Sequence, residues 1–182
     1  MIKIISKTVS AVSVLVLGLT LLTPAFAADN SGRSEQRLYG EVRHELAMVP
    51  QVTIFDNLAY SVNGSTVTLY GQVRDAVVKE VAAARVKRLE GVEKVDNQIE
   101  VLPASFNDDR IRTQVARAVF GDARLSSYAI EPLPPIRIIV RNGHVDLEGV
   151  VRTQTDKNSA FIRANGVPGV FSVDNNLRVE QS

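Results

Sequence analysis

Apolar positions along the chain recur with two periods, one typical of helices and one typical of strands. Apolar side chains that return every three to four positions predict a helix from Glu35 to Met48 with one buried stripe. A similar stripe predicts a second helix that starts after Asn107, its expected N-cap, with Asp108 and Asp109 in the first turn, where carboxylates suit the helix dipole. The stripes consist of Leu38, Val42, Leu46 and Val49, and of Ile111, Val115 and Val119.

Each of these helices is followed by an alternating pattern that predicts a β-hairpin. Pairing Val62 with Val67, and Val140 with Val145, places every apolar residue of each hairpin on one face. The same register leaves two-residue turns at 64–65 (Gly-Ser) and 142–143 (Asn-Gly), which suit the two favoured hairpin turn types. It also places Arg137 opposite Glu148 on the other face of the second hairpin.

The chain repeats itself at a spacing of 78 residues. Without any gap, the 44 positions from Leu58 to Val101 contain 15 residues that are identical to those 78 positions later. A second helix and a third strand complete each copy. The helices are expected over 75–89 and 153–165, capped by Asp75 and Thr153.

We therefore predict an α+β protein of two tandem αββαβ domains, over residues 33–102 and 106–180. Each domain is expected to contain a three-stranded mixed sheet with two helices on one face. The third strands are expected over 95–101 and 173–179. Copy two has five extra residues before its first strand, within the loop 121–135.

The first 27 residues have the pattern of a signal peptide. Lys3 and Lys7 precede an uncharged apolar run over 8–22, and residues 25–27 give a small-x-small motif. We expect cleavage after Ala27 and export to a bacterial periplasm. The alternative is a retained membrane anchor, although the run is shorter than the ~20 residues that span a bilayer. No cysteine follows the run, so we expect a protein that is not a lipoprotein.

Composition excludes several function classes. The 182 residues carry a net charge of +1, and removal of residues 1–27, which contain two lysines and no acid, leaves 19 basic and 20 acidic residues. This balance argues against a strongly basic nucleic-acid-binding protein. The absence of cysteine excludes disulfides, cysteine-ligated metals and a cysteine nucleophile.

No catalytic or cofactor-binding motif is present. His44 and His144 are the only histidines, and they fall in different copies, so we expect surface histidines and no metal site. Asp108 and Asp109 form a carboxylate pair that their position in a helix turn already explains. We predict a protein that is not an enzyme and needs no cofactor.

A mixed basic and apolar surface is the strongest binding candidate. Arg110, Arg117 and Arg124 in copy two can contact phosphate through planar guanidinium groups, and Phe120, with the loop residues Leu125 and Tyr128, can enter a lipid interface beside them. The alternative is a solvated helix face with a loop that packs back on its own domain.

The two domains are expected to pack against each other, because the linker over 103–107 is short. We expect this packing to bury part of the open sheet face that carries Thr66, Thr68 and Tyr70. Phe161 and Ile162 replace two alanines of copy one, so they mark an exposed apolar site or the contact between the copies.

Two sequence blocks carry a resemblance to a known family. A glycine- and valine-rich block (64–73, repeated at 143–151) is followed by a Gly-Val-x-x-Val-x-Asn block (91–97, repeated at 169–175). Because both blocks occur in this order in each copy, the chain resembles two consecutive members of the BON domain family. The matching residues are expected to form the fold: Gly71, Gly91, Asn97, Gly149, Gly169 and Asn175. Gly91 and Gly169 are expected at positive φ after a helix.

The resemblance implies a periplasmic protein that supports envelope integrity under osmotic and other stress and binds phospholipid, with no catalytic residues. Our first functional hypothesis is peripheral binding of anionic phospholipid through Arg110, Arg117, Phe120 and Arg124. The alternative is a protein-interaction or chaperone-like module, which binds exported or outer-membrane clients through sheet edges or the apolar pair. Nucleic acid is not an expected partner.

Overall fold

The computed structural model describes residues 25–131 and 134–180, which form two domains of the same plan. Domain 1 contains α1 (Ala25–Ala47), β1 (Asn57–Asn63), β2 (Thr66–Val73), α2 (Ala76–Val86), β3 (Lys94–Asn97) and β4 (Glu100–Val101). Domain 2 contains α3 (Phe106–Phe120), α4 (Ser126–Ala129), β5 (Ile136–Arg141), β6 (His144–Val151), α5 (Gln154–Asn165), β7 (Ser172–Asn175) and β8 (Arg178–Val179). Most of the predicted signal peptide, residues 1–24, lies outside the described residues.

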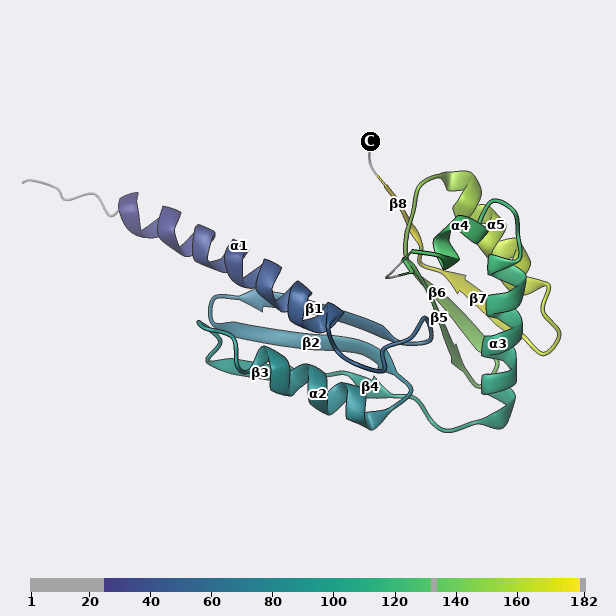
Figure 1. Ribbon diagram of the computed structural model, residues 1–182, viewed down its shortest axis with the longest axis horizontal. Coiled ribbons are helices and arrows are strands. Elements are labelled where there is room, and N and C mark those ends of the chain that lie inside the picture. The colour runs from purple at the N-terminus through teal and green to yellow at the C-terminus, as the bar shows by residue number, and fades with distance from the viewer. Residues whose placement is uncertain (1–24, 132–133, 181–182) are drawn as a thin grey trace, which may run out of the picture.

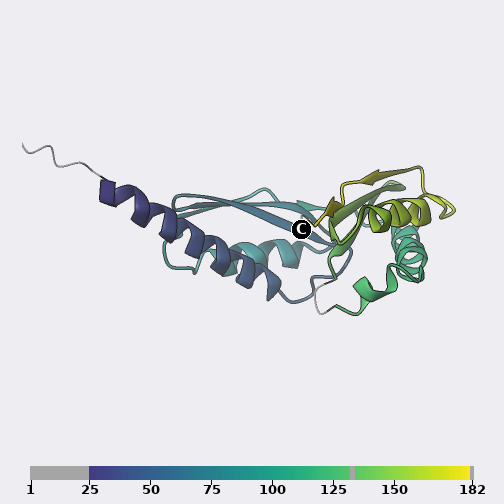
Figure 2. The same cartoon turned by 90° about the horizontal axis from the view of Figure 1, so that it is seen from above.

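Each sheet is mixed, with its helices on one side (Figures 1 and 2). β1 pairs with β2 in antiparallel fashion, and β3 and β4 run parallel to β2 on its other side; β5 to β8 repeat this arrangement. The predicted fold class is confirmed. No helix in the described ranges combines the length and the apolar character needed to cross a bilayer.

The hairpin registers are those predicted from the hydrophobic pattern. Val62 lies opposite Val67, Val140 opposite Val145, and Arg137 opposite Glu148. Asn142 and Gly143 have φ values of 51° and 81°, as the type I′ turn requires. Strand pairing and turn chemistry therefore agree, which leaves little freedom for a register shift.

The third strand differs from its prediction, because it is interrupted in both domains. The Asn97 side chain donates to Lys79 O and accepts from Ile99 N, and Asn175 makes the equivalent bonds to Lys157 O and Leu177 N. These hydrogen bonds are made where β3 ends and β4 begins, and where β7 ends and β8 begins, which is where each strand is interrupted. The asparagine thereby links the second helix of each domain to its sheet.

Several helix boundaries also differ from the predictions. α1 begins at Ala25, ten residues before the expected start. Ser105, and not Asn107, is the N-cap of α3, and its hydroxyl accepts from Asp108 N at 3.2 Å. Asp75 and Thr153 cap α2 and α5 as predicted. Gly91 and Gly169 have the expected positive φ.

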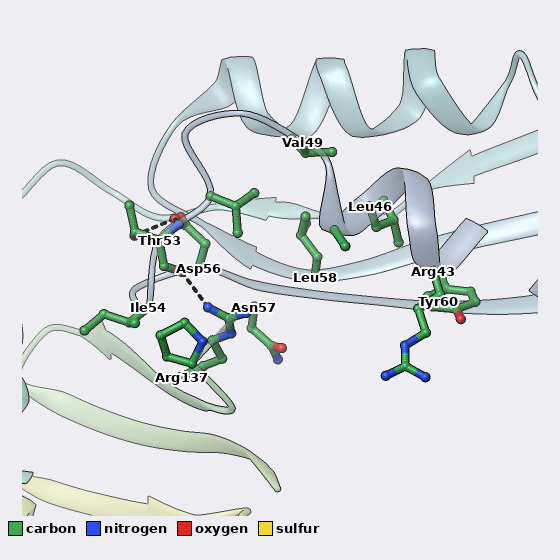
Figure 3. Close-up of a pocket in the computed structure, with 13 residues that line it drawn as sticks. Arg43, Leu46, Val49, Thr53, Ile54, Asp56, Asn57, Leu58, Tyr60 and Arg137 are labelled. Atoms are coloured by element: carbon green, nitrogen blue, oxygen red, sulfur yellow. Dashed lines mark hydrogen bonds between the residues drawn. The ribbon is translucent and has the colours of Figure 1, made fainter. Parts of the chain in front are cut away.

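The loop over residues 53–56 of domain 1 forms hydrogen bonds to domain 2. Ile138 N donates to Ile54 O at 2.8 Å, and Arg137 Nη1 donates to Thr53 O at 3.2 Å. The loop is fixed by the buried carboxylate of Asp56, which accepts from Thr53 N and Thr53 Oγ1 (Figure 3). The same carboxylate also accepts from Arg74 N. Domain packing is thus as expected, but the surface predicted for it is wrong. Tyr70 stays 43% exposed, because the loop that precedes β1 makes the contact and the open sheet face does not.

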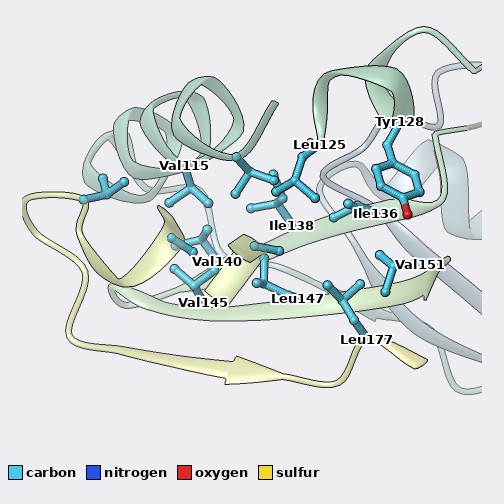
Figure 4. Packing of buried hydrophobic residues seen from close by; sticks show 14 of the residues in the cluster. Val115, Leu125, Tyr128, Ile136, Ile138, Val140, Val145, Leu147, Val151 and Leu177 are labelled. Carbon is cyan, nitrogen blue, oxygen red and sulfur yellow. The ribbon is translucent and has the colours of Figure 1, made fainter. Parts of the chain in front are cut away.

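Each domain has its own hydrophobic core between sheet and helices. In domain 2 the core extends beyond the helix–sheet layer, because Leu125 and Tyr128 cover β5 from above (Figure 4). Phe55 of domain 1 packs against this core from the junction. Domain 1 has no insertion like α4, and its core is the smaller of the two buried clusters.

Candidate functional site

Two buried charged side chains hold α3 against the sheet of domain 2. The Asp108 carboxylate accepts from Asn142 N and Gly143 N, both at 2.9 Å, which ties the start of α3 to the β5–β6 turn. Arg112, also buried, donates to Val140 O and to Asp109 Oδ1, both at 2.6 Å. Both side chains face the sheet, so the opposite face of α3 points away from the sheet. The sequence analysis did not predict either contact.

The outer face of α3 carries a line of residues spaced by three or four positions, of which three are exposed and Gln114 is half-buried. We call this line, Phe106, Arg110, Gln114 and Arg117, the α3 stripe. Phe106 is 97% exposed. Arg110 donates only to the neutral groups Asn107 Oδ1 and Gln114 Oε1. Within the described ranges, neither Arg110 nor Arg117 forms an ion pair, so no carboxylate there is paired with either guanidinium group.

A groove separates the α3 stripe from the C-terminal end of α5. This cavity of about 500 Å³ is lined by Gln114, Arg117 and Ala118 on one side and by Ile162, Arg163 and the segment 166–168 on the other. Ile162 is 66% exposed at its rim. Arg163 is paired with Asp122 at 2.8 Å, and Asp122 has a lowered pKa, chiefly because it accepts from the backbone N–H of Arg124. The groove therefore combines apolar walls with a net positive charge.

A second exposed aromatic residue lies at the same end of domain 2 as Phe106. Phe171 is 77% exposed, and its backbone N–H donates to Gly143 O. Gly143 is also bound by Asp108, which lies two residues after Phe106. Arg110 approaches Gly169 in the same segment as Phe171. Two exposed phenylalanines and an unpaired arginine therefore occur on neighbouring segments.

The structure separates the residues that the sequence analysis grouped into one binding surface. Arg110 and Arg117 lie on the α3 stripe, and Arg124 is exposed beyond the end of the helix. Phe120 is half-buried against the domain 2 core. The prediction that Leu125 and Tyr128 enter a lipid interface is wrong, because both are buried in that core.

The hydroxyl of Tyr128 is held inside the domain. It donates to Asp156 Oδ2 at 2.9 Å and accepts from Arg152 N at 2.8 Å, and its pKa is raised, chiefly by burial. These bonds explain why the loop packs back on its own domain, which was the alternative interpretation of the sequence.

Exposed Phe106 was missed by the sequence analysis. Its signal was an apolar residue directly after the helix cap, away from the buried stripe and at the position where copy one has Arg33. Phe161 and Ile162 are both exposed, so they do not form the contact between the domains.

The remaining candidates for chemistry are held in structural contacts or lie apart. Asp109 pairs with Arg112 and, across the junction, with Arg74. His44 lies on α1 and His144 on β6, where its Nδ1 is 2.7 Å from Ser172 Oγ. Residues 25–131 and 134–180 contain no group of three side chains that could hold a metal ion.

Similar solved structures come from a bacterial secretion system. One is the C-terminal domain of CdsD, the structural protein of the Type III secretion system of Chlamydia trachomatis, at 11% identity and a TM-score of 0.28; the match covers 79% of this chain and 98% of that chain. A second CdsD structure matches at 14% identity and a TM-score of 0.29, over 80% and 93% of the two chains.

A similar curated protein is the "Outer membrane lipoprotein DolP" of Haemophilus influenzae, at 38% identity over 120 residues. The match covers 63% of this chain and 58% of that protein, so the chain matches little more than half of its relative. This relative contradicts our predicted localisation, a periplasmic protein that is not a lipoprotein. The prediction rested on the absence of cysteine, which is informative only about acylation of a cysteine in this sequence.

The sequence profile of the BON domain matches residues 34–103 and 107–181. Together the two matches cover most of the chain, and each includes the glycine, valine and asparagine positions that the sequence analysis singled out. Neither the name of the domain nor that of the relative states a catalytic activity. The chain belongs to the BON domain family, of which it contains two tandem copies.

Proposed function

We propose that this protein is a non-enzymatic component of the bacterial cell envelope that binds anionic phospholipid surfaces through the α3 stripe and the groove beside it. The observation that carries the proposal is the pairing of charge and apolar exposure on one helix face. Arg110 and Arg117 have no acidic partner within the described ranges, and Phe106 on the same face is almost fully exposed.

This combination suits a lipid surface. Guanidinium groups bind phosphate through two parallel hydrogen bonds, and an exposed aromatic side chain gains free energy when it enters the interface. Ile162 and Phe171 add apolar area near the two ends of the stripe. Arg124 is a further cation at the C-terminal end of α3, whereas Phe120 contributes only through its exposed part. The name of the Haemophilus relative supports a location at the envelope.

The test is co-sedimentation of the protein with phosphatidylglycerol vesicles and with phosphatidylcholine vesicles, at low and high salt. We expect binding to the anionic vesicles only, and loss of binding at high salt. Each basic residue near an anionic surface contributes about 1 kcal/mol, so the double variant Arg110→Gln/Arg117→Gln should bind roughly 30-fold more weakly.

A matched control is the double variant Lys87→Gln/Arg88→Gln, which removes the same charge from an exposed site in domain 1. It should bind like the unmodified protein. Equal weakening of both double variants would show a non-specific charge effect and would refute a site on α3. Phe106→Ser separates the apolar contribution, because it should weaken binding without changing the salt dependence.

Client binding remains the second candidate function, because Phe161 and Ile162 expose apolar area on α5. If vesicles do not bind at low salt, the groove is better explained by a protein client. A Phe161→Ser/Ile162→Ser variant that loses such a client would then support this alternative.

A further inference from the structure

The equivalent edge strands of the two domains differ in the hydrogen bonds that their outward-facing backbone groups make. β5 and β1 are equivalent strands at the edges of their sheets, and Tyr60 and Val62 correspond to Ile138 and Val140 at the repeat spacing. In domain 2 the outward-facing groups of the edge are bonded: Ile138 N donates to Ile54 O, and Val140 O accepts from Arg112 Nη2. Within the described part of domain 1, neither contact has a counterpart at Tyr60 N or Val62 O. The residue equivalent to Arg112 is Tyr39, whose ring packs on Tyr60 with 4.6 Å between the centroids.

The backbone of β1 therefore has an open edge. A two-residue turn closes on the hydrogen-bonded pair of Asn63 and Thr66, so the N–H and C=O groups of residues 58, 60 and 62 point away from β2. In the described part of the chain, Tyr60 N–H and Val62 C=O have no hydrogen-bond partner, whereas Tyr60 C=O accepts from Tyr70 Oη at 3.3 Å.

Features that usually block strand addition are absent from this edge. Natural edge strands are commonly protected by proline, by charged side chains or by a covering segment. The sequence of β1 over residues 57–63 contains no proline and no charged residue. A seven-residue edge of this kind is a ready template for another strand.

The apolar side of this edge is incompletely covered as well. Ile136, Ile138 and Val140 are fully buried, since α4 and Phe55 lie against the same core. The equivalent residues of β1, Leu58, Tyr60 and Val62, are only half-buried, because domain 1 has no α4 and no neighbouring loop over them.

A cavity of about 400 Å³ lies beside this strip of β1. Leu46 and Val49 from the end of α1, together with Leu58, form its apolar wall. Arg43 and Arg137 lie at opposite ends of the group of lining residues (Figure 3). Neither arginine forms an ion pair with a described residue. Asp56 is the only acidic residue that lines the cavity, and three donors already bind it, so the cavity has a net positive charge.

We propose that the open edge of β1 and the adjoining cavity bind an extended, acidic polypeptide segment of a partner protein, which adds to the sheet of domain 1 as a further strand. The segment's backbone pairs with Tyr60 and Val62, an apolar side chain enters the cavity, and carboxylates pair with Arg43 and Arg137. A polypeptide fits better than a lipid here, because only a strand offers donors and acceptors at the alternating spacing of the edge. The site consists of domain 1 residues together with Arg137 of domain 2, and it shares no residue with the α3 stripe or its groove, so it is independent of the proposed lipid surface.

The experiment uses the 15N-labelled protein and a synthetic peptide in which valine and glutamate alternate. Titration should give saturable shifts of the Leu58, Tyr60 and Val62 amide signals, with the Val145 and Leu147 amides in the central strand of domain 2 unchanged as internal controls. The same peptide N-methylated at alternate residues cannot pair and should not bind. Arg43→Gln should weaken binding about two- to fivefold, as expected for a partly exposed ion pair, and the matched variant Arg88→Gln should not.

Three outcomes would overturn the proposal. Equal binding of the N-methylated peptide would show that the cavity takes an amphipathic anion and not a strand. Equal binding of a peptide with glutamine in place of glutamate, together with an unaffected Arg43→Gln variant, would remove the acidic specificity. Concentration-dependent shifts of the same three amides without peptide would assign the edge to a second copy of the chain.

Discussion

The carboxylate of Asp108 binds the backbone N–H of Gly143 at 2.9 Å, so the first turn of α3 is anchored to the β5–β6 turn. A weaker version of this contact occurs in domain 1, where Glu35 Oε1 accepts from Gly64 N at 3.3 Å. The domain 2 contact is buried and uses both carboxylate oxygens. Since the α3 stripe begins two residues before Asp108, the orientation of the candidate membrane surface depends on this anchor.

Removal of the anchor should destabilise domain 2. Asp108→Ala leaves the buried Gly143 N–H and the partly buried Asn142 N–H without an acceptor, and hydrogen bonds to a charged group contribute about 1.5–3 kcal/mol each, with incomplete additivity. We expect the free energy of unfolding of domain 2 to fall by about 3 kcal/mol, measured by urea denaturation. Glu35→Ala, the control at the exposed equivalent site, should cost less than about 1 kcal/mol. Equal costs would show that burial of the contact is unimportant.

A glycine in β6 permits the close approach of two strands. Gly149 has φ +121°, and a Cβ atom there would collide with Pro135 O; Gly71 and Asn57 O have the same relationship in domain 1. Gly149→Ala should therefore cost about 3 kcal/mol or abolish folding of domain 2. Gly64→Ala is the control, because Gly64 has φ +58° with open space around it and should cost only about 1–2 kcal/mol. Thermal unfolding of both variants distinguishes the collision from the cost of positive φ alone.

The fold could be predicted because both copies of the repeat carry the same sequence pattern. The register of each hairpin followed from two independent signals, the alternation around Val62 and Val140 and the chemistry of the two turns. Features without a counterpart in the other copy were not predictable in this way. Leu125 and Tyr128 lie in the insertion of copy two, and an apolar residue next to arginines has the same sequence pattern whether it packs on its own core or on a membrane.

The candidate site was predicted only in part for the same reason. Helical spacing is enough to place Arg110 and Arg117 on one face, but not to decide which neighbouring aromatic residue is exposed. Phe120 is turned toward the core and Phe106 is not, because the helix starts at Phe106 and its buried face is fixed by Ile111 and Val115. The junction through Phe55 depends on a contact between distant loops, which no local pattern encodes.

An acidic pair on the open face of domain 2 makes its stability depend on pH. Asp146 lies opposite Asp174, and its pKa is raised, first by burial and then by Asp174. A carboxyl with a raised pKa binds its proton more tightly in the folded state than in the unfolded chain, so folding stability increases as pH falls from neutral through that pKa. Urea denaturation of the unmodified protein and of Asp146→Thr should show this increase as the difference between their free energies of unfolding, from pH 7 down toward the ordinary pKa of 3.8, because the opposite contribution of Asp122 is common to both.

The equivalent positions in copy one provide a matched substitution that tests this carboxylate pair. Thr68 occupies the position of Asp146, opposite Asp96. Asp146→Thr should stabilise domain 2 by about 0.2–1 kcal/mol at pH 7 and remove the pH effect, because it removes a like-charge pair. Thr68→Asp should destabilise domain 1 by a similar amount. A Thr68→Asp variant as stable as the parent would show that the facing carboxylates do not interact.

Phe55 should control the coupling of the two domains without stabilising either domain core on its own. Its ring packs against the domain 2 core, with the Arg74 guanidinium 5.8 Å from the ring centroid. Arg74 also pairs with Asp109 across the junction at 3.4 Å. Phe55→Ala removes the apolar contact, about 1–2 kcal/mol for a half-buried ring, and should raise the opening equilibrium of the junction roughly tenfold.

The amide of Ile138 reports this opening directly, because its hydrogen bond to Ile54 O crosses the junction. In Phe55→Ala, hydrogen exchange at Ile138 should be faster by that factor, while the amides of Leu69 and Leu147, in the centre of each sheet, should exchange as before. Phe171→Ala is the control for loss of an aromatic ring, since Phe171 is 77% exposed and makes no contact with loop 53–56 among the described residues. If Leu147 became equally unprotected, Phe55 would be part of the folding core of domain 2 and the two domains would not be separable units. Unchanged exchange at Ile138 would instead mean that the polar contacts of the junction, the hydrogen bonds to loop 53–56 and the ion pairs between the domains, hold the domains together without the ring.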